Sequence, residues 1–187
     1  MCIRDRPIIN LVPVPYEIKI NKRSDNKYKN YYEFGIVKNR TRNNLIVKAV
    51  QRSLKAKETV LIIIERTEHG KTLQKMLKYN KIEAPFVEGG TRTKERTSVK
   101  RQLKIKSQKV VICSKVWKEG INIPSLNHVI IAHGMKEEKM VLQALGRGLR
   151  TTKNKTTIKI TDFLDPYKYL AEHSILRMQI YVNNGWI

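Results

Sequence analysis

Short runs of apolar, largely β-branched residues alternate along this chain with longer segments of helical periodicity. The apolar runs have the length and composition of strands that are buried on both faces. They comprise residues 59–64, 84–87, 110–113, 129–132 and 158–163. Strands that alternate with helices of about ten to fifteen residues predict βαβ units, whose right-handed crossovers place helices on both faces of a parallel sheet. The sequence therefore predicts a three-layer α/β fold, with its functional loops at the carboxyl ends of the strands.

Between and around these runs, apolar residues recur at spacings of three and four and predict helices. The helical segments include residues 43–54, 73–77, 91–105, 137–150 and 167–181. Residues 7–15 instead alternate apolar residues with prolines, which predicts an extended connector. Residues 21–30 are polar and basic, and we expect a loop or the surface of a helix there.

The chain carries a large excess of basic residues. Its 187 residues include 38 Lys and Arg against 16 Asp and Glu, a formal charge of +22, while 41% of the residues are apolar. The apolar content is high enough for a packed core and excludes a disordered basic tail. Such a charge on a folded domain favours nucleic acid as a partner. The alternative is compositional drift, because a chain rich in Lys, Asn and Ile is also what AT-rich DNA encodes.

Cysteine content and hydropathy favour the cytoplasm and no contact with a membrane. Cys2 and Cys113 are too few for a disulfide framework, as is usual in a reducing compartment. No run of about 18 apolar residues predicts a membrane-spanning helix, and the chain does not open on the apolar segment of a signal peptide.

On composition the chain divides into three parts. Residues 1–6, MCIRDR, back-translate to a sequence that resembles a transposase end used as a sequencing-library adapter. We therefore expect these six residues not to belong to the protein, which would then begin upstream of Pro7 and be represented here by a metagenomic fragment. Residues 7–40 are expected to be an extended connector, and residues 41–187 a single α/β domain.

The helix ending in QALGRGLR, residues 143–150, is the most informative segment. Gln143, Arg147 and Arg150 share one face of this helix, while three leucines, at 142, 145 and 149, share the opposite face. Arginine suits such a convergent face because its planar, permanently charged fork grips phosphate oxygens. On these residues alone, an ordinary solvated amphipathic helix remains an equal alternative.

Four segments in order resemble the second RecA-like domain of superfamily 2 helicases. Q-x-x-G-R-x-x-R at 143–150 resembles their motif VI, and residues 114–134 resemble motif V. Residues 60–73 resemble motif IV, and residues 87–96 resemble the segment between motifs IV and V. The resemblance covers about residues 39–181 and is nearest to DNA-directed helicases of phages and prokaryotes. It implies a RecA-like fold and a first domain, missing from this chain, to which residues 7–40 would connect.

For the nucleotide, the resemblance implies specific roles. Arg147 and Arg150 would reach across the interdomain cleft to the outer phosphates of ATP, assisted by Gln143. Arginines of this kind accelerate phosphoryl transfer by a factor of about 10³–10⁵. Gly120 and Asn122 occupy the positions of motif V that lie near the nucleotide. The family usually has Asp where this chain has Asn122, so this position would act without a charge.

For nucleic acid, the resemblance implies a second set of contacts. Ser114 matches the hydroxyl residue of motif V that contacts the backbone. Arg66 and His69 are expected to line the nucleic-acid side of motif IV. Arg92 and Arg96 follow a Gly-Gly pair and are expected to hold phosphates, with a solvated surface as the alternative for Arg92.

Gly-Lys-Thr at 70–72 follows a strand and opens a helix, as a phosphate-binding loop would. The full pattern needs a glycine at position 65, where this chain has Glu65, so we do not expect a Walker A motif. We expect no metal site, because no further ligand completes a set with His128 and His133. Asp162 and Asp165 lie in or beside the last apolar run and are expected to serve turns or caps.

The sequence thus predicts the carboxyl-terminal half of an ATP-dependent helicase that acts on nucleic acid, DNA rather than RNA. ATP and Mg²⁺ would be held mainly by the missing first domain, its partner in the same chain, so the part present here should be inactive alone. A non-enzymatic basic nucleic-acid-binding module is the alternative from another class. An autonomous P-loop NTPase that uses Lys71 is a weaker alternative, which Glu65 disfavours.

Overall fold

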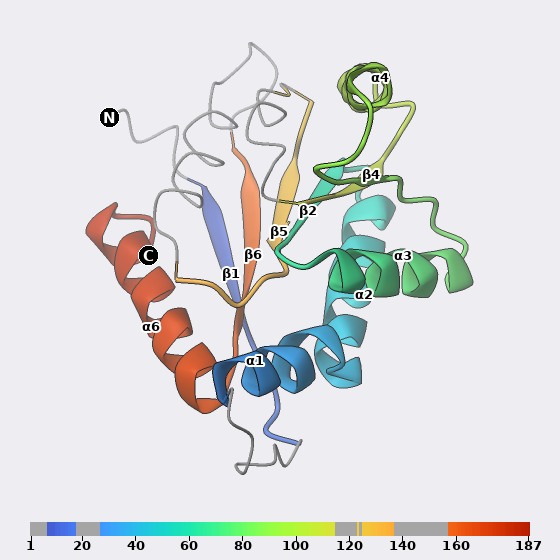
Figure 1. Ribbon diagram of the computed structural model, residues 1–187. Helices are drawn as coiled ribbons and strands as arrows, with labels where there is room; N and C mark the ends of the chain where they lie inside the picture. The colour runs from blue at the N-terminus through green and yellow to red at the C-terminus, as the bar shows by residue number, and fades with distance from the viewer. Residues whose placement is uncertain (1–6, 18–26, 115–122, 124, 137–156) are drawn as a thin grey trace.

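A computed structural model describes residues 7–17, 27–114, 123, 125–136 and 157–187 of the chain (Figure 1). The strands are β1 (Ile8–Pro13), β2 (Val60–Ile64), β3 (Phe86–Val87), β4 (Val110–Ser114), β5 (His128–Ile131) and β6 (Lys159–Leu164). The helices are α1 (Lys27–Tyr32), the π-helix η2 (Glu33–Val37), α2 (Arg40–Lys55), α3 (Thr67–Tyr79), α4 (Thr93–Lys104) and α6 (Lys168–Asn183). In the described part of the chain, no helix is long and apolar enough to cross a membrane.

The six described strands form one parallel sheet in the order β1-β6-β5-β2-β4-β3. β2 lies inside the sheet, where Ile62 pairs with Ile112 of β4 on one side and with Ile130 of β5 on the other. Every residue of β2, β4 and β5 is buried, as expected for strands covered on both faces. The parallel sheet predicted from the five apolar runs is confirmed.

Alternate residues of the strands point to opposite faces of the sheet and build two cores. Ile62 and Ile64 of β2 pack with α2 and α3 in one core. Leu61 and Ile63 pack in the core on the opposite face of the sheet, which α4 covers. On that same face, α6 covers the part of the sheet formed by β1 and β6. In Figure 1, α6 lies on the left of the sheet and α2 and α3 on the right. The three predicted layers are therefore present.

The segment 7–40 was expected to be a connector, but its described residues, 7–17 and 27–40, pack on this domain. Residues 8–13 are extended as predicted, but they pair along their whole length with β6 as an edge strand. The helices α1 and η2 then pack Tyr32 and Ile36 against Tyr167 and Leu170. Gly35 allows this close approach, since a Cβ there would lie 2.7 Å from the Leu170 side chain. The described residues of this segment therefore do not form a connector outside the domain.

Most predicted elements shift only at their ends. α2 begins three residues earlier than expected because Asn39 caps it, its side chain accepting a hydrogen bond from the Arg42 amide at 3.0 Å. The predicted strand 84–87 shortens to Phe86–Val87. Pro85 has no amide to donate and contributes only its carbonyl, which the Ile112 amide reaches at 3.0 Å. The helix predicted at 137–150 lies outside the described residues.

Candidate functional site at the carboxyl edge of the sheet

All six described strands run in one direction, so the segments that follow them meet at a single edge of the sheet. In open parallel sheets this carboxyl edge is where ligands bind. The described segments there are Glu65–Arg66 after β2, the loop 88–92 after β3, Ser114 at the end of β4, residues 132–136 after β5 and Asp165 after β6. Several residues predicted to form the site therefore gather at one edge.

Ser114 is the last residue of β4 and pairs with Ile64, the last residue of β2. It is almost completely buried, and its hydroxyl has no hydrogen-bond partner among the described residues. A buried hydroxyl without a partner costs free energy unless something else satisfies it. Its position at the end of a central strand is consistent with the predicted contact to a ligand.

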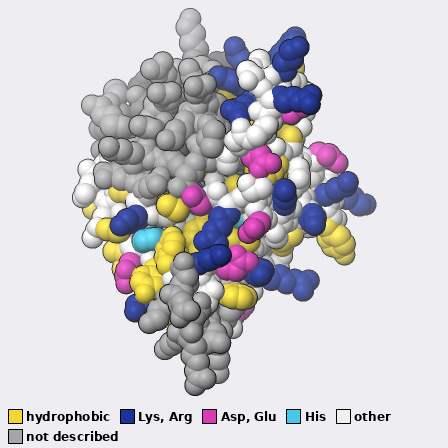
Figure 2. All heavy atoms as spheres, in the orientation of Figure 1, with side chains coloured by type: hydrophobic (Ala, Val, Ile, Leu, Met, Phe, Trp, Pro, Cys, Tyr) yellow, Lys and Arg dark blue, Asp and Glu magenta, His cyan; other side chains and the backbone are white. Residues whose placement is uncertain are grey.

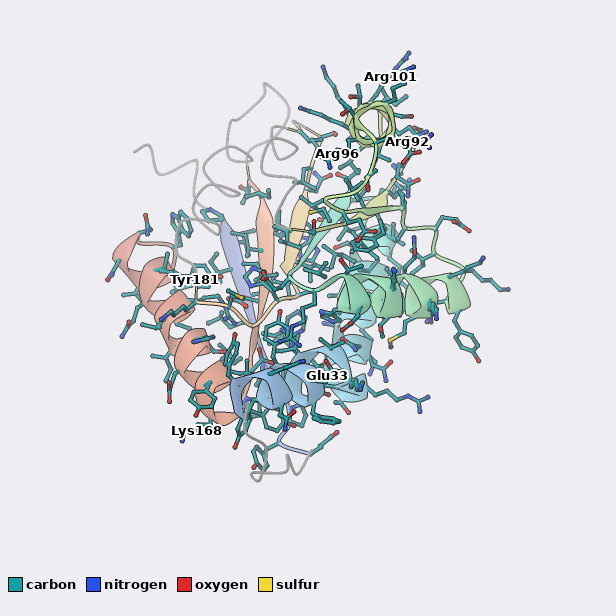
Figure 3. All side chains as sticks on the ribbon, in the orientation of Figure 1. Glu33, Arg92, Arg96, Arg101, Lys168 and Tyr181 are labelled. Atoms are coloured by element: carbon teal, nitrogen blue, oxygen red, sulfur yellow. The ribbon has the colours of Figure 1, made fainter. Side chains whose placement is uncertain are left out.

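Arg66 follows β2 and is held in place by groups from the amino-terminal segment. Its guanidinium lies over the Tyr32 ring, 4.3 Å from the ring centre, and its Nη1 lies 3.5 Å from Glu33 Oε2. Glu33 also pairs with Lys38 at 2.8 Å and raises the pKa of that exposed lysine. Figure 3 shows Glu33 on the helical segment in front of the sheet. Arg66 is thus partly exposed at the carboxyl edge, as predicted, but already has an acidic partner.

The expectation that His69 lines this edge is wrong, because the residue lies inside the domain. The side chain is completely buried, and its Nε2 lies 2.8 Å from the Asn43 amide oxygen. Burial, aided by the nearby Arg42 charge, lowers the pKa of His69 to about 3, so the ring is neutral at pH 7. The spacing of His69 with Leu73 and Leu77 places all three on the inward stripe of α3, which is a signal that the sequence did contain.

The loop 88–92 contains one exposed arginine and is shaped by another. Arg96 donates from Nε to the Thr91 carbonyl at 2.8 Å and from Nη2 to the carbonyls of Glu88 and Gly89. Arg96 therefore holds the loop, whereas Arg92 stands exposed at its end. Figure 3 shows Arg96 on the side of α4 nearer the sheet. Thr67 of α3 donates to the Glu88 carboxylate at 2.9 Å, which ties the loop to the start of α3.

Two buried ion pairs beneath the edge were not predicted. Arg42 Nε lies 2.7 Å from Asp165 Oδ1, and Arg177 Nε lies 2.8 Å from Asp162 Oδ2. The Tyr181 hydroxyl donates to the same Asp162 oxygen at 2.7 Å. Both aspartates pair with arginines from distant helices, so the expected turn and cap roles are wrong. An acid within an apolar strand needs such a partner, because an isolated buried charge is very costly.

The same arginines hold the chain that leaves β5. Arg42 Nη1 donates to the Ala132 carbonyl at 2.7 Å, and Arg177 Nη1 donates to the Met135 carbonyl at 3.0 Å. His173 Nδ1 lies 2.9 Å from the carbonyl of Gly134 between them. Three side chains from α2 and α6 thus hold three of the four carbonyls of residues 132–135. The chain leaves the described part of the structure immediately after this segment, at residue 136.

The residues predicted to face the nucleotide lie outside the described residues. They are Gly120, Asn122, Gln143, Arg147 and Arg150. The Gly-Lys-Thr triplet is described, and it lies within α3. Gly70 faces Phe86, where a Cβ would lie 2.6 Å from the ring, so close packing of α3 on β3 requires this glycine. Within the described ranges, no group of three or more His, Cys, Asp or Glu side chains could hold a metal ion.

A three-layer domain with this parallel sheet and a polar carboxyl edge is a RecA-like domain of the superfamily 2 helicase type. The chain belongs to the family described as the helicase conserved C-terminal domain, whose model matches residues 41–152. The resemblance inferred from the four motifs is therefore confirmed at the level of the family.

Among curated relatives, the ATP-dependent DNA helicase uvsW of Enterobacteria phage T4 is 27% identical over 159 residues. This match covers 76% of the present chain but only 32% of the relative. Putative helicase 22 of a Sulfolobus islandicus filamentous virus is 29% identical over 129 residues, which cover 68% of this chain and 23% of that protein. The chain thus spans about a third or less of the length of these relatives.

Solved structures agree with this assignment. The crystal structure of T4 UvsW matches with a TM-score of 0.72 and 25% identity, over 96% of this chain and 40% of that one. The Saccharomyces cerevisiae protein Dbp5, bound to RNA and ADP BeF3, matches with a TM-score of 0.67 and 15% identity, over 99% of this chain and 41% of that one. The second likeness shows the fold alone.

Proposed function

We propose that this chain is the carboxyl-terminal half of the motor of an ATP-dependent helicase or translocase that acts on DNA. The observation that carries the proposal is the family match over residues 41–152 on a sheet whose described motif segments end at one edge. Ser114, Arg66 and the loop 88–92 all lie at that carboxyl edge. The name of the phage T4 relative, an ATP-dependent DNA helicase, favours DNA over RNA.

In this proposal the domain supplies residues that act on the outer phosphates of ATP. Arg147 and Arg150 would neutralise the charge that develops on the transferred phosphoryl group, and Gln143 would assist them. Gly120 and Asn122 would lie beside the nucleotide. ATP and Mg²⁺ would be held mainly by a first RecA-like domain, and closure of the two domains would bring the arginines to the phosphates.

The described residues would hold the nucleic-acid backbone. Ser114 brings a buried hydroxyl that still lacks a partner among the described residues, and Arg92 brings an exposed guanidinium. Arg66 would exchange its long contact with Glu33 for a phosphate. Because these groups recognise phosphates and not bases, binding should be independent of sequence and should weaken steeply with salt.

The test requires the enzyme that contains this domain together with its first RecA-like domain. Arg147→Ala or Arg150→Ala should lower kcat for DNA-stimulated ATP hydrolysis by a factor of about 10³–10⁵. Lysine at either position should not restore activity fully, because an ammonium cannot reproduce the fork of a guanidinium. Arg52→Ala on the exposed surface of α2 is the matched control and should leave kcat unchanged. Near-normal turnover in both arginine variants would refute the proposed role of residues 143–150.

A further inference from the structure

The outer face of α4 carries a line of exposed cations. Lys94, Arg101 and Lys104 are all exposed, and their spacing places them within about 80° of one another round the helix. The inner face carries Val99 and Leu103, which pack into the core on that side of the sheet. Figure 2 shows Lys and Arg side chains gathered over α4 at the upper right of the molecule.

No acidic side chain balances this line of cations among the residues that the structure describes. Glu95 is the one acid within α4, and the helical repeat places it about 100° round the helix from Lys94. Lys94, Arg101 and Lys104 take part in no ion pair with any other described residue. In Figure 3, Arg101 lies on the side of α4 away from the sheet. The three charges are therefore available to a partner.

We propose that this face of α4 binds the phosphate backbone of a nucleic-acid duplex that continues beyond the carboxyl-edge site. The inference rests on the proposed function and adds to it a second contact surface. Arg92, at the carboxyl edge, directly precedes α4, so the cations extend from that edge along the helix. From Lys94 to Lys104 the helix rises about 15 Å, a length over which each strand of a duplex presents four or five phosphates at about 3.4 Å each.

The composition of the face fits phosphate better than it fits a protein partner. Stable protein interfaces need a core of aromatic or other large apolar side chains. Between its cations, the outer face of α4 carries the small hydroxyl residues Thr97 and Ser98, and α4 contains no aromatic residue. Cations and hydroxyls are the groups that contact phosphate oxygens.

The test compares two triple variants of the 187-residue chain that remove the same charge from different helices. One is Lys94→Ala, Arg101→Ala and Lys104→Ala. The other is Lys48→Ala, Arg52→Ala and Lys55→Ala, three exposed cations of α2 on the opposite face of the sheet. Alanine is the best helix former, so both variants should keep their melting temperatures. Binding of a mixed-sequence 30-base-pair duplex is measured by fluorescence anisotropy over a range of salt concentrations.

The α4 variant should bind the duplex at least about tenfold more weakly at low salt. The slope of log affinity against log salt should fall by about 2–3, since each phosphate that is no longer neutralised lowers it by about 0.9. The α2 variant should keep the slope of the unaltered chain.

An equal loss of affinity in both variants, or no loss in the α4 variant, would overturn the α4 surface while leaving the proposed function intact. Absence of duplex binding by the unaltered chain would overturn both, and competition by polyglutamate as strong as that by DNA would reassign the face to acidic proteins.

Discussion

The buried arginines and aspartates under the carboxyl edge form two ion pairs that are shielded from solvent. The Arg177 and Asp162 side chains are both fully enclosed, and the Tyr181 hydroxyl shares the same carboxylate. Burial lowers the pKa of Arg177, but the charge and hydrogen bond of Asp162, together with the charge of Asp165, raise it by more. Burial and the carboxylate together raise the pKa of Tyr181, which keeps its proton and remains a donor.

Arg177→Met should therefore lower the free energy of unfolding by about 3–5 kcal/mol, because it leaves Asp162 charged, buried and without its partner. Urea unfolding, followed by circular dichroism at pH 7, measures this loss. The control is Lys159→Met. It breaks the ion pair between Lys159 and Glu58, which has a similar length of 2.6 Å but a lysine side chain that is 40% exposed. It should cost less than about 1 kcal/mol. Equal costs for the two variants would mean that the buried pair has no special role.

Two of the buried histidines, His69 and His128, predict that acid destabilises the domain. Burial lowers the pKa of His69 to about 3 and that of His128 to about 4, against about 6.5 in the unfolded chain. Between these values the unfolded chain binds more protons, so stability is complete above about pH 6.5 and falls as the pH drops. From pH 7 to pH 5, each histidine should contribute a loss of about 2 kcal/mol.

His128→Gln separates one of these contributions. Its ring bridges the Ser53 and Thr161 hydroxyls at 2.7 and 2.8 Å, so glutamine preserves a polar group between them. Urea unfolding at pH 7 and pH 5 should then show a loss of stability about 2 kcal/mol smaller than that of the unaltered chain. If the variant lost as much stability as the unaltered chain over this interval, His128 would not be a source of the pH dependence.

At the level of elements, the apolar runs were sufficient to predict five strands, because a buried parallel strand has to be apolar along its whole length. The sixth strand, β1, was missed because Pro7, Pro13 and Pro15 indicated a connector. An edge strand tolerates proline, since one side of its backbone needs no partner. That β1 lies at an edge depends on its pairing with β6, far away in the chain, and no local pattern contains this information.

The site was predictable only in part, because contacts between residues far apart in the chain leave no local pattern in the sequence. The family resemblance selected Ser114 and Arg66 as expected contacts of nucleic acid, and the structure describes both at the carboxyl edge. It did not show that Asp165 pairs with Arg42, a contact across most of the chain. The Gly-Lys-Thr triplet illustrates the opposite problem, because a local pattern typical of phosphate binding is explained by the packing of Gly70 against Phe86.

At the level of the whole molecule, we expect the folding unit to include the amino-terminal elements β1, α1 and η2. β1 covers the edge of β6, and residues 32–37 cover Tyr167 and Leu170 at the carboxyl edge. The family match begins at residue 41, so it omits both. Fully buried side chains are worth about 1.5–3 kcal/mol each, and this segment contributes Tyr32, Ile36 and Val37 to the core. Their sum is comparable to the roughly 5–15 kcal/mol that stabilises a typical domain.

A chain of residues 41–187 alone should therefore fail to unfold cooperatively and should aggregate, because it exposes the unpaired edge of β6 and the apolar cluster around Tyr167. Thermal unfolding with light scattering measures both properties. Deletion of residues 1–6 is the control, and it should leave the melting temperature unchanged if MCIRDR does not belong to the protein. A 41–187 chain that melted cooperatively at the temperature of the full chain would show that β1, α1 and η2 do not contribute to the stability of the domain. Aggregation together with a stable 7–187 chain would place the start of the folding unit between residues 7 and 41.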